Sequence, residues 1–420
     1  MKFSVYAGLL CLATFGSATF AQAADTVAWT LGPAIQRAIE VAPESRAAEA
    51  EVAVREGDLK RDSAFPNPTV EGRVDQKLGL DDGAGGTDVT QIAIAQSLPL
   101  WRRQYQRAQA EASLDAARAA RRYRQLLLEN EATRAFHQLQ LAQARQRLAG
   151  ERADAAMRYG ESKRAGGGLV RYLSALDRTR LAILKESARL ELVAADGEWR
   201  EASARFSKLL GLPDAETPVT TSLNPLAPPP ALAEYQARLD AHPALVASQR
   251  DIEAARAAIG AARASRFADP TLTVSRERDV LGGTRQDYWG VTLGVQVPLW
   301  NLNGGAVDAA VANVSRTEAD ADARRRDLDA ALRASHLRLA RLIEQADQYA
   351  AKVLDPSRRF LDLTGRSFAA GELGVLALLD ANNNYFDAAQ QHLELVAEAA
   401  LAAADLRLAA GESALKGVQP

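Results

Sequence analysis

Residues 101–166 read WRRQYQRAQAEASLDAARAARRYRQLLLENEATRAFHQLQLAQARQRLAGERADAAMRYGESKRAG and contain no proline. The stretch predicts a single helix of about 65 residues, which at a rise of ~1.5 Å per residue is on the order of 100 Å long. Ordinary globular helices have only three or four turns. A helix of this length must lie against other helices along its length, as in a coiled coil, a stalk or a tube.

The long helix is expected to fold back as a hairpin over residues 101–211. It ends at Gly166-Gly167-Gly168, after which a helical pattern continues to Gly211, and glycine is the expected residue after a last helical turn. The first arm is rich in alanine, which lets helix backbones approach closely. In the second arm, apolar residues at spacings of three, four and seven predict the buried seam: these are Leu169, Leu173, Leu176, Ile183 and Leu190.

Composition and the first residues bound the class of protein. Only 6% of the 420 residues are aromatic, which favours long helices over one large core, and the net charge of -2 gives no basic surface for a nucleic-acid partner. Lys2, an apolar run and Ala21-Gln22-Ala23 predict a signal peptide over residues 1–23. The single cysteine, Cys11, lies in that run, so the mature chain is expected to have no disulfide and no thiolate metal ligand.

The order of motifs occurs twice, at offsets near 200 residues, which predicts a tandem duplication. A proline-rich linker over residues 213–230 separates a first repeat, 24–212, from a second repeat, 231–412, and residues 413–420 form a tail. The second long helical hairpin is expected over about 301–411. The matching motifs are Phe65-Pro66-Asn67-Pro68 with Phe267-Ala268-Asp269-Pro270, Leu98-Pro99-Leu100-Trp101 with Val297-Pro298-Leu299-Trp300, and Arg164-Ala165-Gly166 with Ala369-Ala370-Gly371.

Each repeat also predicts a β-hairpin, over about 69–98 and about 271–298. In the second hairpin, apolar residues alternate with small or polar ones, as in a strand with one face in lipid and the other toward a polar lumen. Tyr288 and Trp289 stand where an aromatic girdle is expected. For one strand alone, a half-buried strand of a soluble sheet is the alternative. The alternating apolar residues are Trp289, Val291, Leu293, Val295 and Val297.

The number of strands bears on the oligomeric state. No window of about 18 apolar residues follows the signal peptide, so membrane insertion is expected only through β-strands. A lipid-exposed sheet must close on itself, and four strands are too few for a membrane barrel. Two chains would give eight strands and three would give twelve, and the strand count alone does not choose between them.

These motifs resemble the TolC-type outer membrane efflux factors. The resemblance covers nearly the whole mature chain and is most specific in Phe65-Pro66-Asn67-Pro68, Gln96-Ser97-Leu98-Pro99-Leu100, Arg164-Ala165-Gly166, Ala370-Gly371-Glu372-Leu373 and Leu378-Leu379-Asp380-Ala381. It implies a mainly helical fold with a β membrane part, in which long helical hairpins form an α-barrel through the periplasm. It also implies a homotrimer whose four strands per chain make a twelve-stranded β-barrel in the outer membrane.

The same resemblance implies a function. The chain would be the exit duct of a tripartite efflux system, passively conducting substrates from a proton-driven pump of the resistance-nodulation-division type through a periplasmic adaptor (membrane fusion) protein. It is most similar to the branch serving cobalt-zinc-cadmium-type metal exporters, whereas related branches export drugs, dyes or proteins. A soluble periplasmic coiled-coil scaffold or adaptor is the competing interpretation, and it leaves the two lipid-patterned strand pairs unexplained.

The resemblance assigns site residues at the far end of the helical hairpins. The two tip turns would dock the adaptor, although both glycine turns would also serve as helix C-caps in any hairpin. Asp380 and its counterpart in the first repeat, Asp177, would form a channel constriction of six carboxylates near one height; the alternative is that both are solvated surface residues. The docking residues are Gly166, Gly167, Leu169, Gly371, Glu372 and Leu373.

Two smaller features have simple alternatives. His137 and His336 are 199 residues apart and occupy equivalent places on the long helices; they would make a weak metal site if they faced a bore, and are otherwise packing or surface residues. Gly150 and Pro356 each lie about fifteen residues before a tip, which predicts that the last turns bend independently. The sequence has no phosphate-binding glycine loop after a strand and no His-x-x-x-His pair, so no enzyme, cofactor or resident metal is expected.

Overall fold

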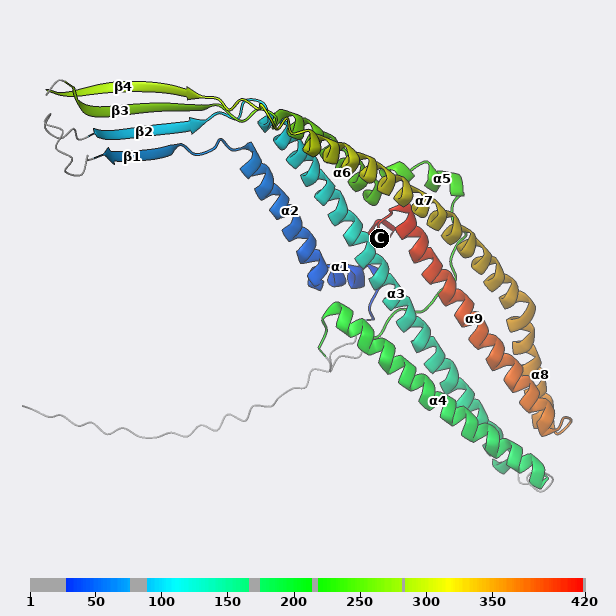
Figure 1. Ribbon diagram of the computed structural model, residues 1–420. Helices are drawn as coiled ribbons and strands as arrows, with labels where there is room; N and C mark the ends of the chain where they lie inside the picture. The colour runs from blue at the N-terminus through cyan, green and yellow to red at the C-terminus, as the bar shows by residue number, and fades with distance from the viewer. Residues whose placement is uncertain (1–27, 76–88, 166–173, 214–217, 282–283, 418–420) are drawn as a thin grey trace, which may run out of the picture.

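The structure, a computed structural model, describes residues 28–75, 89–165, 174–213, 218–281 and 284–417 (Figure 1). The predicted signal peptide over 1–23 and the glycine-rich loop of the first β-hairpin lie outside these residues. The first tip turn, with Gly166, Gly167 and Leu169, also lies outside them.

Two helical hairpins make up most of the chain, as predicted. The first consists of α3 (Arg103–Ala165) and α4 (Ala175–Leu210), and the second of α7 (Gly304–Tyr349), a π-helical turn η3 (Ala350–Leu354), α8 (Asp355–Ala370) and α9 (Val375–Ala410). α3 has 63 residues, and α4 and α9 have 36 each. The second long helix was predicted from about residue 301; it begins only at Gly304 and is interrupted by η3.

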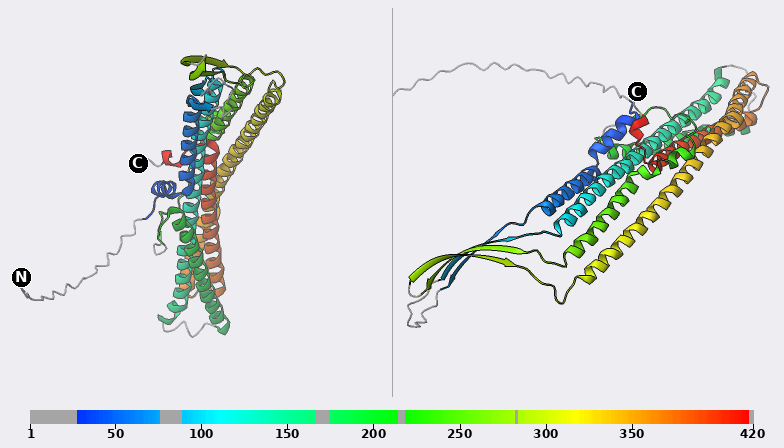
Figure 2. Two further views of the ribbon diagram at one scale, coloured as in Figure 1. Left: turned by 60° about the vertical axis from the view of Figure 1, so that its left-hand side comes forward. Right: turned by 90° about the horizontal axis from the view of Figure 1, so that it is seen from above.

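Shorter helices continue the return arms toward the sheet. α1 (Leu31–Val41) and α2 (Pro43–Ser63) follow α4 in space, while α6 (Pro243–Ala264) follows α9 (Figures 1 and 2). α5 (Leu232–Gln236), η2 (Leu239–Ala241) and η4 (Ala414–Gly417) lie near the middle of the molecule. Both joints use a left-handed glycine: Gly211 (φ 61°) ends α4 against Val41, and Gly411 (φ 70°) ends α9 against His242.

The helices lie side by side in an elongated wall with the sheet at one end and the hairpin tips at the other (Figure 2). In the half nearer the sheet, α3 packs against α2 and α6; in the half nearer the tips it packs against α4 and α9. α7 and α8 pack on the far side of α9. Along the half nearer the tips, α4 and α8 are therefore the two edges of the wall.

The core lies between these helices and is built from medium-sized side chains. Phe136 and Leu139 of α3 meet Phe206 of α4 and Ile35 of α1 in one cluster. A second cluster joins α7 and α9, with members that include Leu332, Leu339, Leu342, Val396 and Leu406. The predicted close packing of alanine on α3 is confirmed at several positions, with Ala132 fully buried.

The predicted seam of α4 is wrong. Leu176, Ile183 and Leu190 are 58, 63 and 62% exposed, whereas Leu173 and Leu169 lie outside the described residues. The face of α4 that packs against the chain carries Leu181, Leu184, Ala188 and Ala195 instead. The regular leucine stripe is an apolar surface on the edge of the wall.

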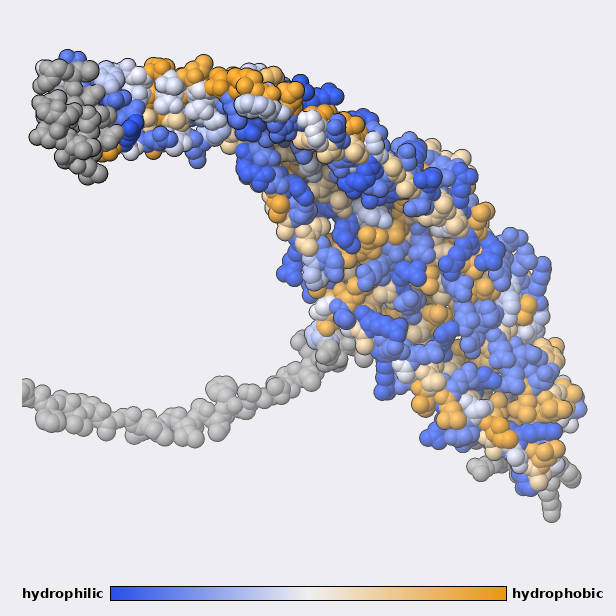
Figure 3. All heavy atoms as spheres, in the orientation of Figure 1, coloured by the Kyte–Doolittle hydropathy of each residue, from blue (hydrophilic) through white to orange (hydrophobic). Residues whose placement is uncertain are grey.

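Four antiparallel strands form one sheet in the order β1 (Thr69–Asp75), β2 (Val89–Ser97), β3 (Thr271–Leu281) and β4 (Thr284–Gly294). The register places four β-branched residues in one row across all four strands: Val70, Ile94, Val274 and Val291. On the opposite face, the neighbouring row consists of Thr69, Ala95, Thr273 and Thr292. The predicted alternation is confirmed, and hydrophobic residues run along the sheet onto the first helical turns (Figure 3).

The second β-hairpin is shorter than predicted, because β4 ends at Gly294 and not near 298. Val295 and Val297 lie beyond the strand and are 56 and 65% exposed. Within the described part of the chain, every helix falls short of the length and apolarity needed to cross a membrane.

Candidate functional site

The second tip turn contains three of the predicted docking residues. Gly371 ends α8 with φ 84°, and its N–H donates to the Phe368 carbonyl at 3.1 Å. The Glu372 N–H donates to the Ser367 carbonyl at 2.9 Å, which closes the helix end as a Schellman motif. Gly371 is thus a C-cap, as the simpler interpretation predicts. The turn presents Glu372 and Leu373 to solvent.

Just behind the tips, the two helical hairpins pack against each other. Leu181 of α4, Phe368 of α8 and Leu378 of α9 belong to one buried cluster, with Tyr159 of α3 packed against it. The cluster holds the ends of four helices at a common level. Both hairpins therefore lie next to each other just behind the tips.

Asp177 has a structural role at the start of α4. Ser174 is the N-cap, and its Oγ accepts the Asp177 N–H at 3.0 Å while donating to an Asp177 carboxylate oxygen at 2.8 Å. Asp177 also lies 3.4 Å from Arg180. Ser174 thus caps α4 through its side chain, and the Asp177 carboxylate fixes the Ser174 hydroxyl by accepting its hydrogen bond.

The two predicted constriction residues are not at one height. α4 and α9 have equal lengths, and Asp177 is the third residue of α4 whereas Asp380 is the sixth of α9. Three residues correspond to ~4.5 Å of helix rise. By position within α4 and α9, Asp177 and Asp380 thus differ by almost one turn. By position in the helix, Asp380 corresponds to Arg180.

Asp380 is an exposed carboxylate at the end of a heptad series that the sequence analysis missed. Glu394 and Asp387 precede it on α9 at intervals of seven, and each faces an arginine of α3 at the same interval. Arg145 pairs with Glu394 at 2.7 Å, and Arg152 lies 3.9 Å from Asp387. The next position of the series on α3 is occupied by Tyr159, so the ladder of cations stops before it reaches Asp380.

The arginine ladder also binds the first hairpin to the second. Arg145 reaches Glu198 of α4 at 3.3 Å, and Arg152 reaches Glu191 of α4 at 2.7 Å and the Asn383 amide oxygen of α9 at 2.9 Å. Each arginine thus bridges α4 and α9 across α3. Arginine and acidic residues seven apart on three different helices are the signal in the sequence, but it is readable only once the helices are known to be neighbours.

The two equivalent histidines are used in packing. The His137 ring donates to the Gln140 side-chain oxygen at 2.8 Å, Gln140 in turn donates to the Thr221 carbonyl, and burial lowers the pKa of His137. His336 donates to the Pro230 carbonyl at 2.8 Å. Both rings therefore help to hold the proline-rich linker against the long helices. No group of three or more His, Cys, Asp or Glu among the described residues is placed to hold a metal ion.

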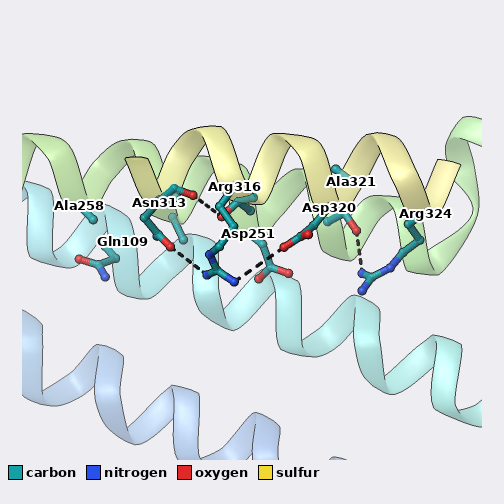
Figure 4. A pocket seen from close by; sticks show the side chains of 12 residues that line it. Gln109, Asp251, Ala258, Asn313, Arg316, Asp320, Ala321 and Arg324 are labelled. Atoms are coloured by element: carbon teal, nitrogen blue, oxygen red, sulfur yellow. Dashed lines mark hydrogen bonds and ion pairs between the residues drawn. The ribbon is translucent and has the colours of Figure 1, made fainter. Parts of the chain in front are cut away.

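A polar hollow of about 340 Å³ lies over α6 between α3 and α7 (Figure 4). Arg324 donates to the Ser248 hydroxyl at 2.8 Å, and Arg316 lies between Asn313 and Asp320. Burial raises the pKa of Asp251, while Arg324 and Arg55 act against the rise. The charged side chains that line the hollow are mostly close to a group of opposite charge or to a hydrogen-bond partner. No motif in the sequence predicted this hollow.

The predicted bend positions differ from each other. Pro356 lies in the first turn of α8, directly after the π-helical turn Ala350–Leu354. A proline removes an N–H donor from the helix, and the wider turn accommodates it. Gly150 lies within α3, which is a continuous helix there. Only the second long helix is locally irregular.

Comparison with known proteins agrees with this architecture. Residues 235–412 match the family described as outer membrane efflux protein. The cobalt-zinc-cadmium resistance protein CzcC of Cupriavidus metallidurans is 24% identical over 266 residues, which are 63% of this chain and 62% of the relative. The chain thus spans less than two thirds of that relative's length.

Two solved channels have the same fold over almost the entire chain. A structure of CusC, described in connection with transmembrane channel formation, has a TM-score of 0.75 at 20% identity and covers 92% of this chain and 93% of that one. The open MtrE outer membrane channel of Neisseria gonorrhoeae has a TM-score of 0.74 at 20% identity, over 93% and 91% of the two chains.

The family match lies within the second repeat, and the likeness to solved structures shows that both repeats share the fold of those channels. Proteins of this type lie in the outer membrane and extend into the periplasm. The chain therefore has the fold of these outer membrane channels, and its residues 235–412 match the outer membrane efflux protein family.

Proposed function

We propose that the protein is the outer membrane exit duct of a tripartite efflux system, and that it conducts substrates passively. The observation that carries this proposal is the combination, in one chain, of a sheet with one apolar face and a 63-residue helix that starts where the sheet ends. At ~1.5 Å per residue that helix extends on the order of 95 Å from the sheet. The alternative of a soluble scaffold does not explain why one face of the sheet is apolar.

Both edges of the wall support assembly into a ring. α4 exposes an apolar stripe that includes Ile183 and Leu190, and the opposite edge exposes Leu363, Phe360 and Val353, which are 60, 43 and 37% exposed. Different surfaces on opposite edges give a head-to-tail contact, which forms a ring when the rotation between neighbouring chains closes. Three chains would supply twelve strands, so we propose a homotrimer with a twelve-stranded barrel embedded in outer membrane lipid.

The heights of the two apolar edges agree. Ile183 is the ninth residue of α4 from the tip, and Leu363 is the eighth residue from the tip end of α8. Leu190 is sixteenth on α4, and Val353 is eighteenth on the other edge. A neighbouring chain at the same height would therefore bring Ile183 to Leu363 and Phe360, and Leu190 to Val353, with α4 and α8 antiparallel.

The tips are the proposed contact with the adaptor protein, which would connect the duct to an inner-membrane pump of the resistance-nodulation-division type. Glu372 and Leu373 project from the second tip over the cluster that joins both hairpins. The first tip, with Gly166, Gly167 and Leu169, is assigned the same role by the duplication. The carboxylate and the leucine offer an adaptor one charged and one apolar contact at each second tip.

Heavy-metal cations are the proposed cargo, with drug or protein export as the alternative. The name of the relative CzcC refers to cobalt, zinc and cadmium resistance. Within this chain, Asp380 is exposed beyond the end of the arginine ladder, so a trimer would present at least three carboxylates near the tips without those partners. Several carboxylates near a narrow passage attract cations. Asp177 is assigned a secondary role, because its carboxylate already accepts the hydrogen bond of the Ser174 hydroxyl.

Conductance of the purified protein in planar bilayers tests this function. We expect a channel with cation preference, in which Asp380→Asn reduces both the preference and the block by divalent cations. Asp362→Asn is the matched control, since Asp362 is an exposed carboxylate of α8 near the same tip and is paired with Arg366. Absence of any channel would refute the duct. A channel whose selectivity is unchanged in Asp380→Asn would refute only the selectivity role.

A further inference from the structure

The apolar face of the sheet changes character at a definite row. Leu272 faces Leu293, and the next row outward from the helices contains Val274 and Val291. One row further, Arg276 faces Trp289, and beyond it Arg278 faces Asp287. All of these residues are on the same face, because successive rows on one face are two residues apart. Two arginines therefore stand on the face that the sequence pattern assigns to lipid.

The two arginines and Asp287 form a compact cluster. Arg278 donates to both carboxylate oxygens of Asp287, at 2.7 and 3.1 Å, and Arg276 donates to one of them at 2.9 Å. The Arg276 guanidinium lies 6.0 Å from the centre of the Trp289 ring. Two cations share one anion, so the cluster has a net charge of +1. Arg276 and Arg278 remain more than half exposed.

The position of the cluster corresponds to an edge of the membrane. Trp300, which is 94% exposed, lies eleven residues beyond Trp289 near the start of the helices. Eleven residues span at most ~36 Å of extended chain, or about 28 Å along the membrane normal for a strand tilted by ~40°. Outer membrane barrels have an apolar band of ~25 Å between two aromatic girdles. Because β4 ends at Gly294, this span is an upper limit, and it allows Trp300 and Trp289 to lie at the two sides of the band.

We propose that Arg276 and Arg278, beside Trp289, bind the phosphomonoester headgroup of a lipid in the outer leaflet. A guanidinium fork matches two phosphate oxygens, and arginine is less strongly hydrated than lysine at such a site. Asp287 holds both guanidinium groups side by side and leaves one positive charge uncompensated. The row of Val274 and Val291 directly below offers a surface for the acyl chains, which a free phosphate ion would not use.

This inference rests on the proposed function, in which the sheet crosses the outer membrane. Native mass spectrometry of the full protein, released from detergent micelles, tests it. The micelles contain equal amounts of phosphatidic acid, which has a phosphomonoester headgroup, and a digalactosyl lipid with the same acyl chains. We expect the wild type to retain phosphatidic acid selectively. The Arg276→Gln/Arg278→Gln variant should retain at least about tenfold less phosphatidic acid than the wild type, because two charge-assisted contacts are lost.

The controls separate the lipid site from charge and from folding. Arg73→Gln removes a charge from the opposite face of β1 and should leave retention unchanged. Arg276→Lys retains the charge without the fork and should give intermediate retention. Equal retention by the wild type and the double variant, or release of the lipid by millimolar inorganic phosphate, would overturn the lipid site. Loss of the oligomer or of outer membrane recovery in the wild type would instead refute the proposed function.

Discussion

At the scale of single residues, His242 shows how one side chain joins two helices end to end. It is 1% exposed, its Nδ1 accepts the Ala244 N–H at the start of α6, and its Nε2–H donates to the Leu408 carbonyl at the end of α9. Both bonds require the neutral ring with the proton on Nε2. The first repeat has Ala42 at the equivalent joint, so this bond pair exists only in the second repeat.

The joint makes stability depend on pH. Burial lowers the pKa of His242 below its usual 6.5 in the folded chain. The contribution of His242 to the free energy of unfolding is therefore complete above pH 6.5. It is lost as the pH falls from 6.5 through the lowered pKa of the folded chain. We expect His242→Ala to be about 1–2 kcal/mol less stable at pH 7, from the lost cap and hydrogen bond.

Chemical unfolding at pH 7.5 and at pH 5 measures the effect. The difference in the free energy of unfolding between the wild type and His242→Ala should be smaller at the lower pH. His137 and His392 also have pKa values lowered by burial. The free energy of unfolding of the His242→Ala variant should therefore still depend on pH, although less than that of the wild type. A difference that is the same at both pH values would exclude titration of His242.

The glycines of the long helices differ in what a methyl group would meet. At Gly411 an added Cβ would lie 2.8 Å from the His242 ring, and φ is +70°; at Gly150 the position is open. We expect Gly411→Ala to destabilise by about 2 kcal/mol or more, from left-handed strain and the close contact. Gly150→Ala should stabilise by about 0.5–1 kcal/mol, because it is mid-helix. Thermal unfolding of both variants checks this prediction. Stability changes of the same sign in the two variants would contradict it.

At the scale of elements, the two long helices are not equivalent near the tip. The second is widened by the π-helical turn Ala350–Leu354 before Pro356, whereas α3 continues through Gly150. We expect hydrogen exchange to be faster at 350–356 than at 148–154, because the irregular turn has weaker backbone hydrogen bonds. Equal protection of the two segments would show that neither is a hinge. Faster exchange at 148–154 would reverse the assignment.

The sequence predicts the elements better than it predicts their burial. Proline-free length, glycine stops and strand alternation are local properties, so α3, α9 and the sheet were predictable within a few residues. The stripe with Ile183 was assigned to the core because spacing shows which residues share a helix face. Spacing does not show whether the neighbour of that face belongs to the same chain, and here Leu184 faces inward instead.

The predicted site was limited by the same kind of information. Gly371 at the second tip was predictable, since a C-cap glycine is a local signal. The arginine ladder was not, because Arg152 meets Glu191 and Asn383 across three helices that are far apart in the sequence. The height difference between Asp177 and Asp380 depends on where α4 and α9 begin. Arg276 and Arg278 lie on β3, whereas the apolar alternation that predicts a lipid-facing side is clearest on β4.

At the scale of the whole molecule, the apolar edges predict the effect of a charge in the seam. Ile183→Glu would place an unpaired carboxylate against Leu363 and Phe360 of a neighbouring chain, which costs several kcal/mol. We expect this variant to fold but to fail to form a stable oligomer. Lys185→Glu, on an exposed face of α4 away from the stripe, should assemble normally. Size-exclusion chromatography in detergent compares the two, and normal assembly of Ile183→Glu would exclude this seam.

The mass of the protein extracted by detergent from the outer membrane fraction tests the exit duct most directly. A duct made from this chain requires several copies, because four strands cannot close a membrane barrel. Light scattering with correction for bound detergent gives the number of chains in the particle. We expect the protein to require detergent for release and to have the mass of three chains. A single chain released by osmotic shock without detergent would contradict the proposed duct.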